Sequence, residues 1–237
     1  RKYFYAHGEC IGITKCYHYF DIYNRHLKKF IGHEVRVLEI GVHSGGSLEM
    51  WKNYFGPQAH IYGLDIEESC KKYSDPRNNI EVFIGSQGDK AFWKSFKEKI
   101  PVVDVIIDDG SHNADDQIIT LEEMLPHLRP GGVYVCEDNK RIMNGFTWYF
   151  TGLVMNLNAV QTVKSSGMAY SDDRCVISTT NFQQHVSSAH LYPYVAVIER
   201  GQSIIKEFRA LKRGSVWNTV QYRAGKGCDK DKETKQA

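Results

Sequence analysis

Five short apolar segments, each followed by a turn or a helix-like stretch, constrain the fold of this chain most strongly. They are VRVLEIG (35–41), HIYGLDI (60–66), IEVFIG (80–85), VVDVIIDD (102–109) and VYVCED (133–138). The runs are continuously apolar, and amphipathic segments such as DKAFWKSFKEKI (89–100) lie between them. That pattern is typical of a parallel sheet covered by helices on both faces. A later segment, 185–200, predicts two antiparallel strands around Pro193. We therefore expect an α/β protein with a Rossmann-like, doubly wound, mostly parallel seven-stranded sheet and a C-terminal antiparallel hairpin.

Composition narrows the classes of partner. The net charge of +2 gives no strong field for nucleic acid or for an anionic membrane. No apolar run approaches the roughly 20 residues that cross a bilayer. The six cysteines form no Cys-x-x-Cys pair, which favours reduced thiols and a cytoplasmic protein over a zinc site or a disulfide scaffold.

Polar residues follow the predicted strands at the point where each strand ends. In an open parallel sheet, ligands bind beyond the carboxyl ends of the strands. The residues expected to converge there on one cleft are Glu39, Gly41, Ser44, Ser47, Asp65, Ile66, Gln87, Asp108, Asp109, Glu137 and Asp138.

The turn EIGVHSGGS (39–47) differs from the Gly-x-Gly-x-x-Gly of dinucleotide-binding proteins and from a P-loop. Asp65, at the end of the second run, suits the two hydroxyls of an adenosine ribose. Glu39 would repel a diphosphate but suits a cationic amino-acid cofactor. The charge pattern favours S-adenosylmethionine over NAD. The simpler interpretations are a strand-to-helix turn for the glycines and a helix cap for Asp65.

Two acidic segments, IIDDGSH (106–112) and CED (136–138), need to be read together. If their strands are neighbours, the strand ends lie about 5 Å apart. Four carboxylates at one place repel one another unless a cation or protons intervene. A set of oxygen ligands without cysteine suits Mg²⁺ or Mn²⁺.

These segments, in this order, resemble class I S-adenosylmethionine-dependent methyltransferases. More narrowly, residues 16–200 are similar to metal-dependent O-methyltransferases of macrolide and rhamnosyl sugars, and to related domains fused to glycosyltransferases in glycan-building, chlorovirus-like proteins. The resemblance implies methylation of a hydroxyl on a deoxyhexose such as rhamnose, within a glycan or glycoside. It also implies a division into an N-terminal aromatic arm or helix over the site (1–30), a cofactor-binding core (31–200) and an extension (201–237) whose polar end, 225–237, is disordered.

The resemblance assigns roles to the acids and to one histidine. Asp109, Glu137 and Asp138 correspond to the metal ligands, and the metal chelates vicinal hydroxyls. Asp108 belongs to the cofactor side. His112 corresponds to the general base, with a pKa suited to that task. The alternative for His112 is a turn histidine that bonds to the backbone.

Several alternatives stay open. A catechol-type O-methyltransferase or a non-catalytic scaffold domain in a glycan-assembly protein would share the fold, and oligomers are compatible with either. Tyr17, Tyr19 and Tyr23 could stack on a sugar or pack in the core. Lys140 and Arg141 could contact an acidic acceptor or form a solvated turn.

Overall fold

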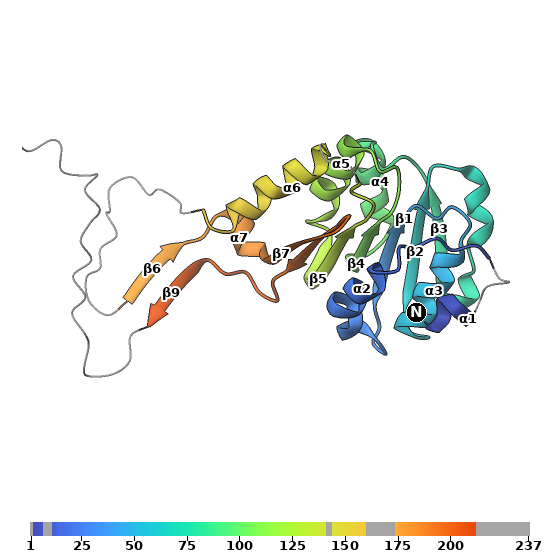
Figure 1. The fold of residues 1–237 in the computed structure, drawn as a ribbon, viewed down its shortest axis with the longest axis horizontal. Coiled ribbons are helices and arrows are strands. Elements are labelled where there is room, and N and C mark those ends of the chain that lie inside the picture. The colour runs from blue at the N-terminus through green and yellow to red at the C-terminus, as the bar shows by residue number, and fades with distance from the viewer. Residues whose placement is uncertain (1, 7–10, 141–143, 160–173, 212–237) are drawn as a thin grey trace, which may run out of the picture.

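The computed structural model describes residues 2–6, 11–140, 144–159 and 174–211. Its centre is a seven-stranded sheet in the order β3-β2-β1-β4-β5-β8-β7 (Figure 1). The pairs from β3 to β5 are parallel, whereas β8 is antiparallel to both β5 and β7. The strands are β1 (Arg36–Ile40), β2 (His60–Asp65), β3 (Ile80–Ile84), β4 (Val103–Asp108), β5 (Leu128–Cys136), β7 (Val186–Tyr192) and β8 (Val195–Arg200). The predicted mostly parallel, Rossmann-like sheet with a C-terminal hairpin is confirmed.

Helices cover both faces of the sheet. The longer ones are α2 (Tyr19–Leu27), α3 (Gly46–Phe55), α4 (Lys90–Lys99), α5 (Ala114–Met124) and α6 (Gly145–Asn156). Short helical segments are α1 (Lys2–Ala6), η1 (Lys28–Phe30), η2 (Glu68–Tyr73), η3 (Pro76–Asn78) and α7 (Asn181–His185). Residues of α2 and α3 pack in one core cluster, and residues of α4, α5 and α6 pack in the other.

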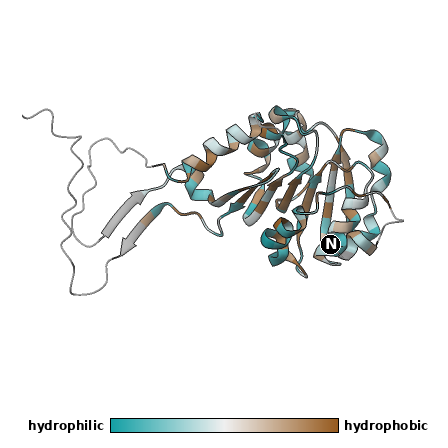
Figure 2. Cartoon of the chain, viewed as in Figure 1, coloured by the Kyte–Doolittle hydropathy of each residue, from teal (hydrophilic) through white to brown (hydrophobic). Residues whose placement is uncertain are grey.

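The two core layers explain the continuous apolar runs. In β4, Val105 and Ile107 belong to the layer under α2 and α3, while Ile106 belongs to the opposite layer. Successive side chains of a strand point to opposite faces, so a strand covered on both faces needs apolar residues throughout. Figure 2 shows the central strands as mostly hydrophobic.

Strand β5 begins before the fifth apolar run (133–138), and helix α5 ends a few residues before that strand. The segment RPGG (129–132) lies inside β5 and is not a turn before it, and the strand accommodates it with a register shift against β4 and a positive φ of 80° at Gly131. Helix α5 ends at Met124, with Leu125 still helical as its C-cap, and Pro126 then has no backbone N–H with which to continue the helix. The expected disorder at 225–237 concerns residues outside the described ranges.

A small two-stranded sheet was not predicted. It joins β6 (Arg174–Ser178) to β9 (Glu207–Leu211) in antiparallel register, away from the main sheet in Figure 1.

The sheet register brings the functional strand ends together. Ile40 pairs with Asp108, and Asp108 pairs with Cys136. The ladder continues beyond the strands, because the Asp109 amide donates to the Ile40 carbonyl and the Glu137 amide donates to the Asp108 carbonyl. The predicted adjacency of the fourth and fifth runs is therefore confirmed, and their acids share one sheet edge.

Candidate active site

A cleft opens at the carboxyl edge of the parallel strands. Among the predicted site residues, Gly41, Ser44, Ser47, Asp65, Ile66, Gln87, Asp109, His112 and Asp138 line it. Glu39, Asp108 and Glu137 are fully buried behind this lining. The segment Gly12–Lys15, which precedes α2, forms a further part of the wall.

Asp65 holds the glycine-rich turn in place. Its Oδ2 accepts hydrogen bonds from the amides of Val42 (2.9 Å) and His43 (2.8 Å). Its Oδ1 accepts one from the amide of Glu67 (2.9 Å), but Glu67 is itself the N-cap of η2, so the helix cap of the simpler interpretation was wrong for Asp65. The same carboxylate faces the cleft, so it can serve both the turn and a ligand.

Gly41 is required by the close approach of two strand ends. Its φ is +93°, and a Cβ at this position would lie 2.1 Å from the carbonyl oxygen of Asp109. Only glycine adopts such a conformation at low cost while leaving room for another backbone.

Asp108 supports the cleft from behind. Tyr134 Oη donates to its Oδ2, and Gln87 Nε2 donates to its Oδ1, both at 3.0 Å. Gln87 Oε1 accepts the Ser111 amide, which links the buried acid to the turn before His112. Burial raises the pKa of Asp108 to about 7, against the effect of these hydrogen bonds.

Lys15 supplies a cation inside the acid cluster. Its Nζ lies 2.6 Å from Asp109 Oδ2, 3.0 Å from Glu137 Oε2 and 3.7 Å from Glu39 Oε1. Burial opposes the charge on Lys15, but Glu137, Asp109 and Glu39 outweigh burial and raise its pKa above the usual range. The sequence predictions missed Lys15, which is one of four lysines in the arm (1–30) expected to cover the site and carries no signal that distinguishes it from the others.

Helices α2 and α3 supply donors to the remaining oxygens of these acids. Tyr23 Oη donates to Glu137 Oε1 and Tyr19 Oη donates to Asp138 Oδ1, both at 2.6 Å. Glu39 accepts from Ser47 Oγ at 2.8 Å and from Trp51 Nε1 at 2.9 Å. Tyr19 and Tyr23 are thus core residues whose hydroxyls position carboxylates.

Three side chains that line the cleft converge beside the buried acids Glu39 and Glu137. Ligand atoms of Asp109, His112 and Asp138 all lie within 4.8 Å of one another. His112 Nε2 is 3.7 Å from Asp138 Oδ2 and 4.0 Å from Asp109 Oδ1. Burial alone would raise the pKa of Asp138, but hydrogen bonds from Lys140 and Tyr19 lower it, so this carboxylate stays ionised.

This open group has the chemistry of a divalent-cation site. The two carboxylates can hold Mg²⁺ or Mn²⁺ with positions left for water or a hydroxyl, and the imidazole lies beside them. Glu137, predicted as a third ligand, does not join the group, because Lys15 and Tyr23 engage both of its oxygens.

A second hollow adjoins the cleft. It shares Ser111, His112 and Asp138 with the cleft and extends along Asn113, Lys140 and Asn144. Both His112 and Asp138 have left-handed backbone conformations, with φ of 56° and 57°. Such conformations are uncommon for residues other than glycine, although Asp and His adopt them more readily than most, and they cluster at functional sites. His112 and Asp138 therefore line both hollows, and Asp109 lines the cleft beside them.

Comparisons with known proteins find similar methyltransferases. The family model "Methyltransferase domain" matches residues 38–139. Demethylmacrocin O-methyltransferase from Streptomyces fradiae is 32% identical over 197 residues, which are 76% of this chain and 47% of that protein. The 8-demethyl-8-(2-methoxy-alpha-L-rhamnosyl)-tetracenomycin-C 3'-O-methyltransferase of Streptomyces olivaceus is 37% identical over 130 residues, 52% of this chain and 32% of that protein. The chain spans about half the length, or less, of these relatives.

A solved structure matches over a longer stretch. It is the MycE methyltransferase from the mycinamycin biosynthetic pathway, in complex with Mg, SAH and mycinamycin VI. The two structures superpose with a TM-score of 0.66 at 28% sequence identity. The match covers 84% of this chain and 52% of the MycE chain. Among the described residues, no helix has the length and apolar character needed to span a membrane.

Proposed function

Because the chain contains a class I S-adenosylmethionine-dependent O-methyltransferase domain related to the macrolide-sugar and rhamnosyl O-methyltransferases, we propose that it methylates a sugar hydroxyl with the aid of a divalent metal. The acceptor is a deoxyhexose such as rhamnose, carried on a glycan or glycoside. The observation that carries the proposal is the convergence of Asp109, His112 and Asp138 between the cleft and the second hollow. The cleft takes S-adenosylmethionine, and the second hollow takes the acceptor.

The cofactor side consists of the lining residues that follow the first three strands. Asp65 accepts the ribose hydroxyls, and Gly41, Ser44, Ser47, Ile66 and Gln87 form the walls. Bound S-adenosylmethionine supplies an electrophilic methyl group on sulfur. Asp108 and Glu39 do not line the cleft but hold residues that do: Asp108 accepts a hydrogen bond from Gln87, and Glu39 accepts one from Ser47.

The metal side consists of Asp109 and Asp138, with Mg²⁺ or Mn²⁺ as the ion. A bound divalent ion lowers the pKa of a coordinated hydroxyl and fixes its direction. Glu137 completes the predicted three-acid set only if the ammonium of Lys15 moves away from it. The complex of MycE with Mg and SAH supports both cofactors.

His112 removes the proton of the attacking hydroxyl. Its side chain is 40% exposed, and its Nε2 lies beyond hydrogen-bond distance of both carboxylates, which leaves the nitrogen available to an acceptor. Alignment of oxygen, methyl carbon and sulfur then supplies the rest of the rate enhancement. Fusion to a glycosyltransferase and a cytoplasmic location remain predictions from the sequence.

A direct assay tests this function. The chain is incubated with isotopically labelled S-adenosylmethionine and a panel of rhamnosides, other deoxyhexosides, macrolide glycosides and catechols, before and after exhaustive chelation. We expect methyl transfer to a glycoside that chelation abolishes and Mg²⁺ or Mn²⁺ restores. Methylation of catechols alone, or full activity after chelation, would overturn the sugar or the metal assignment. A failure to bind S-adenosylmethionine would favour the scaffold alternative.

A further inference from the structure

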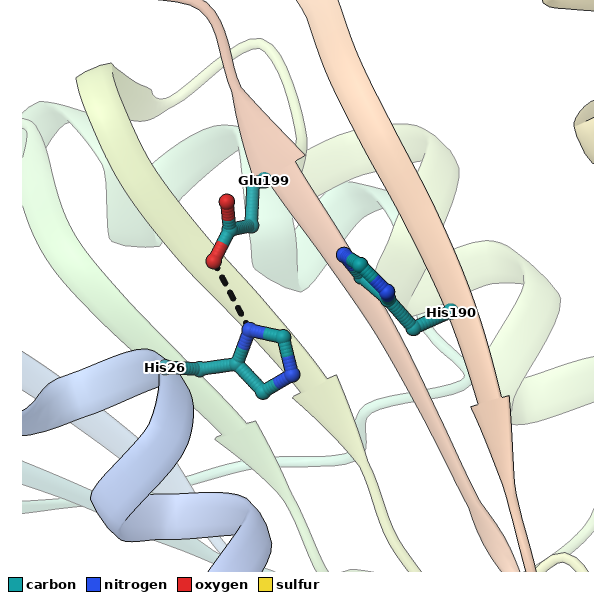
Figure 3. Close-up of side chains that lie close together, drawn as sticks. All are labelled: His26, His190 and Glu199. Carbon is teal, nitrogen blue, oxygen red and sulfur yellow. Dashed lines mark hydrogen bonds and ion pairs between the residues drawn. The ribbon is translucent and has the colours of Figure 1, made fainter.

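A second cluster of metal-ligating side chains lies between α2 and the β7–β8 hairpin. It consists of His26 on α2, His190 on β7 and Glu199 on β8, and Figure 3 shows the three side chains close together. One ligand atom from each residue lies within 4.8 Å of the other two. The cluster shares no residue with Asp109, His112 and Asp138.

His26 is the anchor of this cluster. Its side chain is only 3% exposed, and its Nδ1 lies 2.7 Å from Glu199 Oε1. Its Nε2 lies 2.8 Å from Tyr192 Oη. Because a carboxylate only accepts, Nδ1 carries the proton in this arrangement and Nε2 accepts from the tyrosine.

His190 completes the cluster from the neighbouring strand. Its ring centroid lies 4.8 Å from that of His26. Its Nε2 is 3.1 Å from Ser188 Oγ, and this hydroxyl is also 3.4 Å from Glu199 Oε2. Burial, and then the neighbouring His26, lower the pKa of His190.

We propose that His26, His190 and Glu199 bind a divalent transition-metal ion of the zinc type. Two imidazoles and one carboxylate are a known zinc ligand set, with water in the fourth position. Nitrogen ligands favour zinc, cobalt or nickel, whereas Mg²⁺ and Mn²⁺ prefer the oxygen-rich group in the cleft. The two sites are therefore selective for different ions.

Binding replaces one hydrogen bond by coordination. The His26 ring changes tautomer: the proton leaves Nδ1, and Nε2 takes one up and donates it to Tyr192 Oη. The imidazole therefore stays neutral, while its Nδ1 and the Glu199 oxygen that Nδ1 faced become ligands of the ion. Arg25 donates to Tyr192 Oη at 3.2 Å. Burial raises the pKa of Glu199, but the hydrogen bond from His26 and the charge of Lys29 outweigh burial and lower it. These two cations oppose a dication, so we expect weaker binding than at a dedicated structural zinc site.

The ion would fix α2 on the hairpin. This helix also carries Tyr19 and Tyr23, which position Asp138 and Glu137. A ligand that binds only the folded state stabilises it by mass action. Zinc at this cluster therefore stabilises the docked helix that supports the acids of the cleft.

The test uses the full chain stripped of metal by chelation. Zn²⁺ binding is followed by calorimetry, Co²⁺ binding by its visible absorption, and the melting temperature is measured with and without Zn²⁺, all in the presence of excess Mg²⁺. The variants are His190→Ala and Glu199→Gln, where glutamine keeps an acceptor for His26 but removes the charge. The controls are His112→Ala, in the cleft, and His33→Ala, at an exposed position elsewhere.

We expect Zn²⁺ and Co²⁺ to bind despite Mg²⁺ and to raise the melting temperature. His190→Ala and Glu199→Gln should each weaken binding by roughly tenfold or more, since even a ligand's supporting hydrogen bond is worth that much. Both control variants should bind Zn²⁺ with the affinity of the unmodified chain. The proposal would be overturned if the unmodified chain does not bind Zn²⁺, or if His190→Ala and Glu199→Gln bind it as tightly as the unmodified chain does. It would also be overturned if only His112→Ala loses Zn²⁺ binding. None of these readouts depends on methyl transfer.

Discussion

The ammonium nitrogen of Lys15 lies 2.6 Å from a carboxylate oxygen of Asp109. Lys15 comes from the segment that walls the cleft, and Asp109 comes from the strand end beneath it. Lys15 forms ion pairs with the buried acids Glu39 and Glu137 and also with Asp109. Asp138 lies outside this group of ion pairs, on the open side of the cluster. The chain thus carries a cation of its own beside the place proposed for a metal.

Replacing Lys15 by methionine should destabilise the fold. The change leaves buried acids without their cation, and breaking a buried ion pair on one side costs about 3–5 kcal/mol. Denaturant unfolding measures the change, with Lys94→Met at an exposed position of α4 as the matched control. Equal unfolding free energies for the two variants would show that the pair contributes nothing.

The same Lys15→Met substitution should strengthen Mn²⁺ binding. Lys15 neutralises part of the charge on Asp109 and competes with a metal for Asp109 and Glu137. A gain of about tenfold in affinity corresponds to only ~1.4 kcal/mol of this competition. Electron paramagnetic resonance of free Mn²⁺ in a titration gives the dissociation constant, with the Lys94→Met variant measured alongside. Unchanged or weaker binding would mean that the lysine and the ion do not compete.

His112→Ala should slow methyl transfer and spare cofactor binding. Loss of a general base typically costs about 10²–10⁴-fold in rate. Turnover on the best glycoside is compared with the affinity for S-adenosylhomocysteine, and His33→Ala serves as the control. Normal turnover in His112→Ala would remove the base assignment.

Asp108 should make stability depend on pH. Its pKa is raised to about 7 in the folded chain, against about 3.9 when unfolded. A raised carboxyl pKa gives stability that is fully present below the unfolded value and is lost as the pH rises to the folded value. Relative to Asp108→Asn, the unmodified chain should lose on the order of 4 kcal/mol between pH 4 and pH 7. A difference in unfolding free energy between the two proteins that stays constant from pH 4 to pH 7 would contradict this.

Gly41→Ala should destabilise the chain, because the new Cβ meets the Asp109 backbone at a positive φ. A cost of about 1–3 kcal/mol is typical of such strain. Gly152→Ala is the matched control, since Gly152 lies in α6 with open space around it and alanine favours helices. The control should melt at a slightly higher temperature and Gly41→Ala at a clearly lower one.

The fold was predictable because its signals are local. Continuous apolar runs and the helices between them predict a covered parallel sheet, and the residues after each run predict its functional edge. Lys15 was not predictable in this way, because its partners Asp109 and Glu137 lie 94 and 122 residues away and no period links them.

The division between Glu137 and Asp138 was also hidden. The two acids are adjacent in sequence, but Glu137 faces the interior while Asp138 turns out with a φ of 57°. A list of acids at a strand end therefore does not show which of them a lysine or tyrosine occupies. The sequence analysis also missed the cluster of His26, His190 and Glu199, because its members come from three separate elements, α2, β7 and β8.

The position of Asp109 and Asp138 at the ends of central strands has an evolutionary consequence. The cofactor cleft and the two acids belong to the sheet edge, whereas Asn113, Lys140 and Asn144 of the second hollow belong to connecting segments. Connections tolerate insertions and deletions that strands do not. Descendants of such a chain can change the acceptor they recognise by altering those connections, while inheriting the methyl-transfer chemistry intact.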